Sequence, residues 1–162
     1  MRFAICDDDI QQGTQLANMV RTTDEAVVCE TYTSGEALVA DIRDGQDFDA
    51  VFLDMEMPGM DGIAAGNAIR AIDERLIIVF VTSHTQYAVA SFQCEPLDYL
   101  VKPVEIERLC TVLEKIRHRT RKQRITITFE EGGAYVAFHH VVERAALVAM
   151  REHDNVLQAA VS

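Results

Sequence analysis

Hydrophobic residues fall into five short apolar runs, and between these runs apolar positions recur every three or four residues. The runs are typical of strands buried on both faces of a parallel sheet, and the segments between them of amphipathic helices. Strands are predicted at residues 3–6, 26–32, 50–54, 76–82 and 97–101. Helices are predicted at residues 10–22, 34–45 with Ser34 as its cap, 63–72, 85–92 and 104–122. This strict alternation predicts βαβ units with right-handed crossovers, and therefore a doubly wound α/β fold.

The pattern changes after Arg124. RITITF alternates apolar and polar residues, EEGG at residues 130–133 is typical of a turn, and AYVAFHH has the composition of a returning strand. A second hairpin is expected over residues 146–161. The sequence therefore predicts a short all-β extension at the C-terminal end.

Composition limits the class of protein. With 162 residues, 49% hydrophobic and 25% charged, the chain can form one domain with a core plus an appendage. The net charge of −11 argues against nonspecific nucleic-acid binding by the whole surface. The charge is unevenly distributed, since residues 1–103 hold 6 basic and 18 acidic residues, whereas residues 104–162 hold 9 basic and 8 acidic residues. This asymmetry indicates two parts with different roles.

The expected location is the cytoplasm, with no membrane contact. No apolar run is long enough to cross a bilayer, and the first residues lead straight into a strand pattern without the features of a signal peptide. The four cysteines form no CxxC pair and lie among apolar residues, which is typical of buried, reduced thiols.

Polar side chains follow four of the predicted strands at the point where each strand ends. Because ligands of open α/β sheets bind beyond the carboxyl ends of the strands, these side chains are expected to converge. They are Asp7, Asp8 and Asp9 after the first strand, Asp54 at the third, Thr82 and Ser83 at the fourth, and Lys102 after the fifth.

Such a cluster needs a compensating positive charge. Two carboxylates about 4 Å apart repel by roughly 4 kcal/mol at an effective dielectric constant of ~20. An all-oxygen site with room for water suits Mg²⁺, which readily shares its coordination with a phosphate oxygen. Thr82 and Lys102 are then natural partners of phosphoryl oxygens, and Asp54 becomes a nucleophile that accepts a phosphoryl group as an acyl phosphate.

The motifs ICDDD, VFLDMEMPGMDG, FVTSH and DYLVKP resemble the four signature blocks of response-regulator receiver domains, over about residues 1–120. The resemblance implies a flavodoxin-like (CheY-like) sheet with strand order 2-1-3-4-5. It also implies a role for each matching residue. Asp7, Asp8 and the main-chain carbonyl of Glu56 would bind Mg²⁺, with Asp8 as the direct ligand. Asp54 would accept the phosphoryl group, and Lys102 would sense it. Thr82 would supply the switch hydroxyl and Tyr99 the switch aromatic ring.

The resemblance further implies phosphoryl transfer from a sensor histidine kinase, and an output that is transcriptional or is dimerisation. Glu56 and His84, each two residues after a site residue, are expected to tune the lifetime of the acyl phosphate. The resemblance also implies a cis peptide bond between Lys102 and Pro103. The alternative is a phosphohydrolase of the haloacid dehalogenase type, which also uses a strand-end aspartate and Mg²⁺. That class requires an aspartate two residues after the nucleophile, where this chain has Glu56, and it has a cap domain that this sequence lacks.

The C-terminal part resembles the opening strands of a LytTR-type DNA-binding domain. Only 38 residues follow Arg124, fewer than such a domain needs, so it is expected to be incomplete. The predicted organisation is a receiver over 1–120, a basic linker over 121–124 and a β-rich tail over 125–162. The tail is too short to close a domain, so it is expected to pair with a second copy in a homodimer. DNA is expected as a partner only for a longer or complete chain.

Overall fold

The computed structural model describes residues 1–83, 94–122, 127–131 and 134–138. It divides the chain into two units, Met1–Arg117 and His118–Ser162. The helix predicted at residues 85–92 and the second hairpin predicted at 146–161 lie outside the described residues. None of the helices in the described ranges is long and apolar enough to cross a membrane.

The first unit contains a five-stranded, all-parallel sheet in the order β2-β1-β3-β4-β5. The strand order and fold class predicted from the sequence are therefore confirmed. The strands are β1 (Arg2–Cys6), β2 (Val28–Tyr32), β3 (Ala50–Asp54), β4 (Ile77–Thr82) and β5 (Asp98–Val101). The helices are α1 (Ile10–Thr23), α2 (Gly35–Arg43), α3 (Gly62–Ile72) and α4 (Ile106–Lys122).

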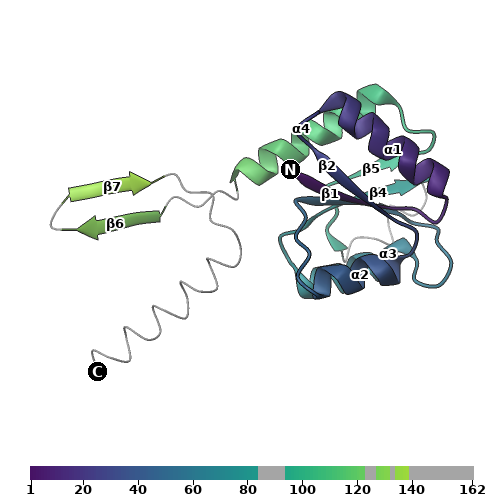
Figure 1. Cartoon of the computed structure of the whole chain (residues 1–162), viewed down its shortest axis with the longest axis horizontal. Coiled ribbons are helices and arrows are strands. Elements are labelled where there is room, and N and C mark those ends of the chain that lie inside the picture. The colour runs from purple at the N-terminus through teal and green to yellow at the C-terminus, as the bar shows by residue number, and fades with distance from the viewer. Residues whose placement is uncertain (84–93, 123–126, 132–133, 139–162) are drawn as a thin grey trace. The chain divides into compact units, whose positions relative to one another are not determined.

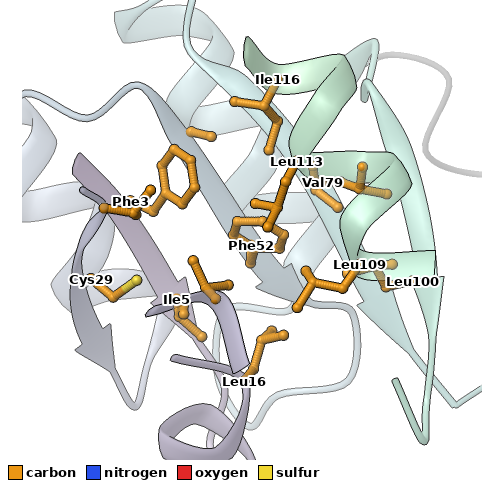
Figure 2. Close-up of a cluster of buried hydrophobic side chains, with 14 of the residues drawn as sticks. Phe3, Ile5, Leu16, Cys29, Phe52, Val79, Leu100, Leu109, Leu113 and Ile116 are labelled. Atoms are coloured by element: carbon orange, nitrogen blue, oxygen red, sulfur yellow. The ribbon is translucent and has the colours of Figure 1, made fainter. Parts of the chain in front are cut away.

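Helices cover both faces of the sheet, with α1 and α4 on one face and α2 and α3 on the other (Figure 1). Alternate residues of each strand point to opposite faces, so two separate cores form. The core beneath α1 and α4 contains Phe3, Phe52, Leu109 and Leu113, all at most 1% exposed (Figure 2). Because β1, β3 and β4 are covered on both sides, they are apolar except at an end residue, as the sequence pattern predicted; these end residues are Arg2, Asp54 and Thr82.

Side-chain caps set where the helices begin. Asp9 accepts hydrogen bonds from the backbone N–H groups of Gln11 and Gln12 at the start of α1. Ser34 caps α2, as predicted, and Asp61 caps α3. The helix predicted from residue 104 begins at Ile106, because the Glu105 carbonyl is the first to accept a helical hydrogen bond, from Leu109 N–H at 3.0 Å.

The second unit contains an antiparallel hairpin of β6 (Ile127–Glu131) and β7 (Ala134–Phe138). The hairpin expected in this part of the sequence is therefore present. Its first strand ends two residues later than predicted, because Glu130 and Glu131, assigned to the turn from sequence, pair with Tyr135 and Ala134. Helix α4 runs to Lys122, so the first half of the segment predicted as a linker is helical.

Candidate functional site

The carboxyl ends of β1, β3, β4 and β5 bring the predicted polar residues together. Asp54 is the last residue of β3 and Thr82 the last of β4, while Asp7 and Lys102 directly follow β1 and β5. Parallel pairing aligns these ends, with Asp54 opposite Val81 and Thr82 opposite Val101. Backbone bonds extend the alignment, since Lys102 N–H donates to the Thr82 carbonyl at 2.9 Å. The sheet thus holds the site residues on rigid backbone.

One ammonium group bridges two buried carboxylates at the centre of the site. Lys102 Nζ lies 2.8 Å from Asp7 Oδ2 and 2.7 Å from Asp54 Oδ2. Asp7 is 6% exposed and Asp54 is 5% exposed. Two carboxylates at this depth repel each other, and a shared cation with short, charge-assisted hydrogen bonds offsets that repulsion. Lys102 therefore holds Asp7 and Asp54 in position.

Burial and charge shift the protonation equilibria in the site. Burial raises the pKa of Asp54, and hydrogen bonds from the Lys102 ammonium and the Glu56 N–H oppose that rise without cancelling it. Burial by itself lowers the pKa of Lys102, but its hydrogen bonds to Asp54 and Asp7 outweigh burial and raise the pKa. Lys102 is therefore a permanent cation at neutral pH.

The donor set fits a hard divalent cation. Asp7, Asp8 and Asp54 each offer a carboxylate oxygen, and these oxygens lie within 4.8 Å of one another. Asp8 is exposed, which leaves the cluster open to water on one side. Three carboxylates and one ammonium carry a net charge of −2, which a divalent cation neutralises. Oxygen donors and access to water are what Mg²⁺ prefers.

The loop between β3 and α3 is folded tightly against Asp54. Gly62 N–H donates to the Met55 carbonyl at 3.1 Å, which closes the loop at its base. A Cβ on Gly62 would lie 2.2 Å from the Asp54 carbonyl oxygen, so no side chain fits there. Gly59 has φ +75°, a conformation that favours glycine. Glu56 N–H donates to Asp54 Oδ1 at 3.2 Å, so the start of the loop also orients the carboxylate.

The other predicted residues lie at or near the site. Thr82 is 2% exposed at the end of β4. The Tyr99 ring stacks on Phe80, with ring centroids 5.9 Å apart and an interplanar angle of 25°. Glu56 has an exposed side chain. The Lys102–Pro103 bond is cis, as the resemblance implied. His84 lies outside the described residues.

Two residues that support the site were missed by the sequence reasoning. Glu36 Oε1 accepts a hydrogen bond from Met60 N–H at 2.8 Å, which joins α2 to the loop that follows Asp54. Gly62 received no role of its own from the sequence, although it packs against the backbone of Asp54. The second glycine of MPGMDG was a signal for Gly62. No local signal pointed to Glu36, because its partner lies 24 residues away.

A groove lies beside the carboxylates, between α1 and the segment that follows β5. A cavity of about 390 Å³ has the Asp7–Lys102 pair among its lining residues, together with Leu16 and Val104. A second, shallow hollow of about 600 Å³, largely open to solvent, runs along α1 from Ile10 to Thr22 and reaches Ile106. Ile10 is 68% exposed and Ile106 is 43% exposed. Apolar side chains are therefore accessible next to the charged site.

Comparison with known proteins identifies the family. A model of the response regulator receiver domain matches residues 3–114. The chain is 31% identical over 128 residues to the positive alginate biosynthesis regulatory protein of Pseudomonas aeruginosa, covering 79% of this chain and 52% of that protein. It is 25% identical over 128 residues to the transcriptional regulatory protein YpdB of Escherichia coli K12, again covering 79% and 52%. The response regulatory domain of mrkE from Klebsiella pneumoniae superposes with a TM-score of 0.68 at 26% identity, over 76% of this chain and all of that one.

The chain therefore belongs to the response regulator receiver domain family, as its sequence motifs predicted. It spans about half the length of the curated relatives that it matches. One of these relatives is named as a transcriptional regulatory protein and the other as a positive regulator of alginate biosynthesis. Membership of this family disfavours the phosphohydrolase alternative.

Proposed function

We propose that this chain is the phosphoacceptor part of a two-component response regulator, in which a sensor histidine kinase transfers a phosphoryl group to Asp54. The observation that carries the proposal is the single Lys102 ammonium shared by Asp54 and Asp7 at adjoining strand ends. A permanent cation next to a strand-end carboxylate stabilises the charge that a phosphoryl group brings.

In the proposed reaction, an oxygen of the Asp54 carboxylate attacks the phosphorus of a phosphohistidine. A P–O bond forms, the P–N bond breaks, and the imidazole of the kinase leaves with the electron pair of that bond. Lys102 can turn from the Asp54 carboxylate to the new phosphoryl oxygens without leaving the site. The rigid position of Asp54 at the end of β3 supplies the orientation that such a displacement needs.

Asp7, Asp8, Asp54 and the main-chain carbonyl of Glu56 would hold the Mg²⁺ ion. The cluster of three carboxylates supports the first three of these ligands, with Asp8 as the most accessible. When bound, the ion neutralises charge on the carboxylates and on the incoming phosphoryl group.

The conformational switch is proposed to use Thr82 and Tyr99. Attraction of the Thr82 hydroxyl toward phosphoryl oxygens would change the space beside β4, into which the Tyr99 ring can turn from its stack on Phe80. The surface around β5 would then have two conformations, and phosphorylation would shift the equilibrium between them. Glu56 and His84 would tune the lifetime of the acyl phosphate by controlling the access of water.

The groove beside α1 supports a protein as the phosphodonor. It places Ile10 and Ile106 on an accessible surface next to the acidic site, so an amphipathic helix of the kinase can pack there. Ile10→Glu should lower phosphotransfer from the kinase but not from a small phosphodonor. Equal loss with both donors would contradict this docking surface.

The proposed organisation is a receiver over 1–120, a basic linker over 121–124 and a β-rich tail over 125–162 that resembles the start of a LytTR domain. The proposed output is control of transcription or dimerisation, with a second copy as partner and with DNA as a partner of a longer or complete chain. The protein is proposed to act in the cytoplasm as a switch that modifies only itself, rather than as an enzyme with turnover.

Phosphorylation of the purified chain tests the proposal. With Mg²⁺ and acetyl phosphate, the wild-type chain should gain one phosphoryl group that is stable in acid and labile to base and to hydroxylamine. Asp54→Asn should remove it, whereas Asp98→Asn, which changes a half-buried aspartate of β5 outside the cluster, should not. Full labelling of the Asp54→Asn variant would refute Asp54 as the acceptor. Repeated hydrolysis of added phosphomonoesters would indicate an enzyme instead.

A further inference from the structure

The loop that follows Asp54 is held at two places. Its base is closed by the bond from Gly62 N–H, at the start of α3, to the carbonyl of Met55, the residue that follows β3. Its far part, at Gly59 and Met60, lies against the N-terminus of α2, a different element. There Glu36 Oε1 accepts the Met60 N–H at 2.8 Å. The side chain of a residue in the first turn of α2 thus satisfies a backbone donor outside its own helix.

Two glycines allow this approach. A Cβ on Gly59 would lie 2.6 Å from Glu36 Oε1, and Gly59 has a positive φ, so the loop backbone passes directly beside the carboxylate. A Cβ on Gly35 would lie 3.0 Å from the Met60 carbonyl oxygen, so the first residue of α2 also packs against loop backbone. The loop and the start of α2 therefore pack closely, and the hydrogen bond from Met60 N–H to Glu36 fixes the orientation of the loop backbone in this contact.

The other end of the same loop touches the site. Glu56 N–H donates to Asp54 Oδ1, and Gly62 lies against the Asp54 carbonyl. The peptide groups between these points include the Glu56 carbonyl, which the proposed function assigns to Mg²⁺. A loop held at both its base and its far part offers that carbonyl at a fixed position, and pre-organisation of this kind raises affinity.

We propose that Glu36 is a positioning residue for the cation site: its hydrogen bond to Met60 N–H fixes the loop that follows Asp54 and so strengthens Mg²⁺ binding, without contact with the ion. This inference rests on the proposed function. It depends on the hydrogen-bond acceptor of Glu36 and not on its negative charge, and this difference makes it testable.

Three variants separate the roles of Glu36. Glu36→Ala removes the acceptor and the charge, while Glu36→Gln removes the charge and keeps an acceptor oxygen. Ser34→Ala is the matched control, because it removes the N-cap of α2 at Ala37 N–H and leaves the Glu36 acceptor intact. Mg²⁺ affinity is measured by calorimetric titration of the full chain, and amide hydrogen exchange at Met60 is measured by NMR without Mg²⁺.

Glu36→Ala should raise the Mg²⁺ dissociation constant by about tenfold, the lower end of the usual effect of residues that support metal ligands. It should also speed exchange at Met60 by roughly fivefold, as expected for the loss of one hydrogen bond. Glu36→Gln and Ser34→Ala should bind Mg²⁺ within about twofold of the wild type.

Other outcomes overturn the proposal in distinct ways. Equal weakening by Glu36→Gln and Glu36→Ala would assign the effect to charge. Equal weakening by Ser34→Ala would assign it to the stability of α2. Wild-type affinity in Glu36→Ala would remove the positioning role while leaving the proposed function intact. A wild-type chain that binds no Mg²⁺ would refute the proposed function itself, and this inference with it.

Discussion

Replacement of Lys102 by methionine tests whether its ammonium is what permits two buried carboxylates at the strand ends. Methionine keeps most of the side-chain volume and removes the charge. Asp7 and Asp54, which are 6% and 5% exposed, then face each other without the cation that now lies 2.8 Å and 2.7 Å from them. The folded state loses this compensation, whereas the unfolded chain keeps both carboxylates in water.

The magnitude follows from burial. Removing one partner of a buried ion pair costs about 3–5 kcal/mol. The Lys102 side chain is 15% exposed, so water reaches the site and the lower end applies, about 3 kcal/mol at pH 7 without Mg²⁺. With a urea m-value of about 2 kcal/mol/M, the midpoint of unfolding should fall by roughly 1.5 M. The matched control is Lys115→Met, which loses an exposed pair with Asp98 and should cost less than about 1 kcal/mol.

The loss should depend on pH with a definite sign. Burial already raises the pKa of Asp54 in the wild type, and removal of the ammonium raises it further. A carboxyl group with a raised pKa binds protons more readily in the folded state, so stability falls as pH rises from the unfolded value of about 4 to the raised value. The penalty of Lys102→Met is therefore complete above the raised pKa and shrinks as the pH is lowered toward about 4.

Mg²⁺ should also reduce the loss. The variant has a cluster charge of −3 instead of −2, so the cation should stabilise the variant more than the wild type. A ligand at 100 times its dissociation constant adds about 2.7 kcal/mol to the free energy of unfolding. Urea unfolding at several pH values, with and without Mg²⁺, measures both effects. A loss that changes with neither pH nor Mg²⁺ would refute the electrostatic reasoning and indicate a packing defect.

Three further predictions test other parts of the site and the unit that carries it. Gly62→Ala should lower the free energy of unfolding by about 2 kcal/mol and weaken Mg²⁺ binding, because its Cβ meets the Asp54 backbone; unchanged urea and titration curves would contradict this. Burial by itself raises the pKa of Asp98, but the hydrogen bond from Lys115 and the charge of Arg108 outweigh burial, so the pKa is lowered. The stability that ionised Asp98 contributes to the fold is therefore lost as pH falls through that lowered pKa. Asp98→Asn should therefore destabilise at neutral pH and match the wild type well below pH ~4; a difference that persists in acid would refute this account. Beryllofluoride, standing in for the phosphoryl group on Asp54, should shift NMR signals of β5 around Tyr99, and shifts confined to the loops next to Asp54 would oppose the proposed switch.

The sequence by itself determined the elements and the chemistry that they carry. Apolar runs predicted the bounds of β3 and β4 within about one residue, because strands buried on both faces are apolar along nearly their whole length. Asp54 could be placed at a strand end and Ser34 at a helix start from local sequence. The family motifs then implied the strand order.

The sequence also predicted that the polar strand ends converge, but only the tertiary structure decided which atoms of these groups pair, and at what distances. Lys102 pairs with Asp7, which is 95 residues away in the sequence, and with Asp54, which is 48 residues away. No hydrophobic periodicity predicts contacts between residues so far apart in the sequence. The same is true of Glu36 and Met60, whose contact requires α2 and the loop after β3 to lie side by side. The physical reason is that hydrophobic periodicity reports which face of an element is buried, whereas hydrogen bonds between side chains depend on how several buried elements pack together.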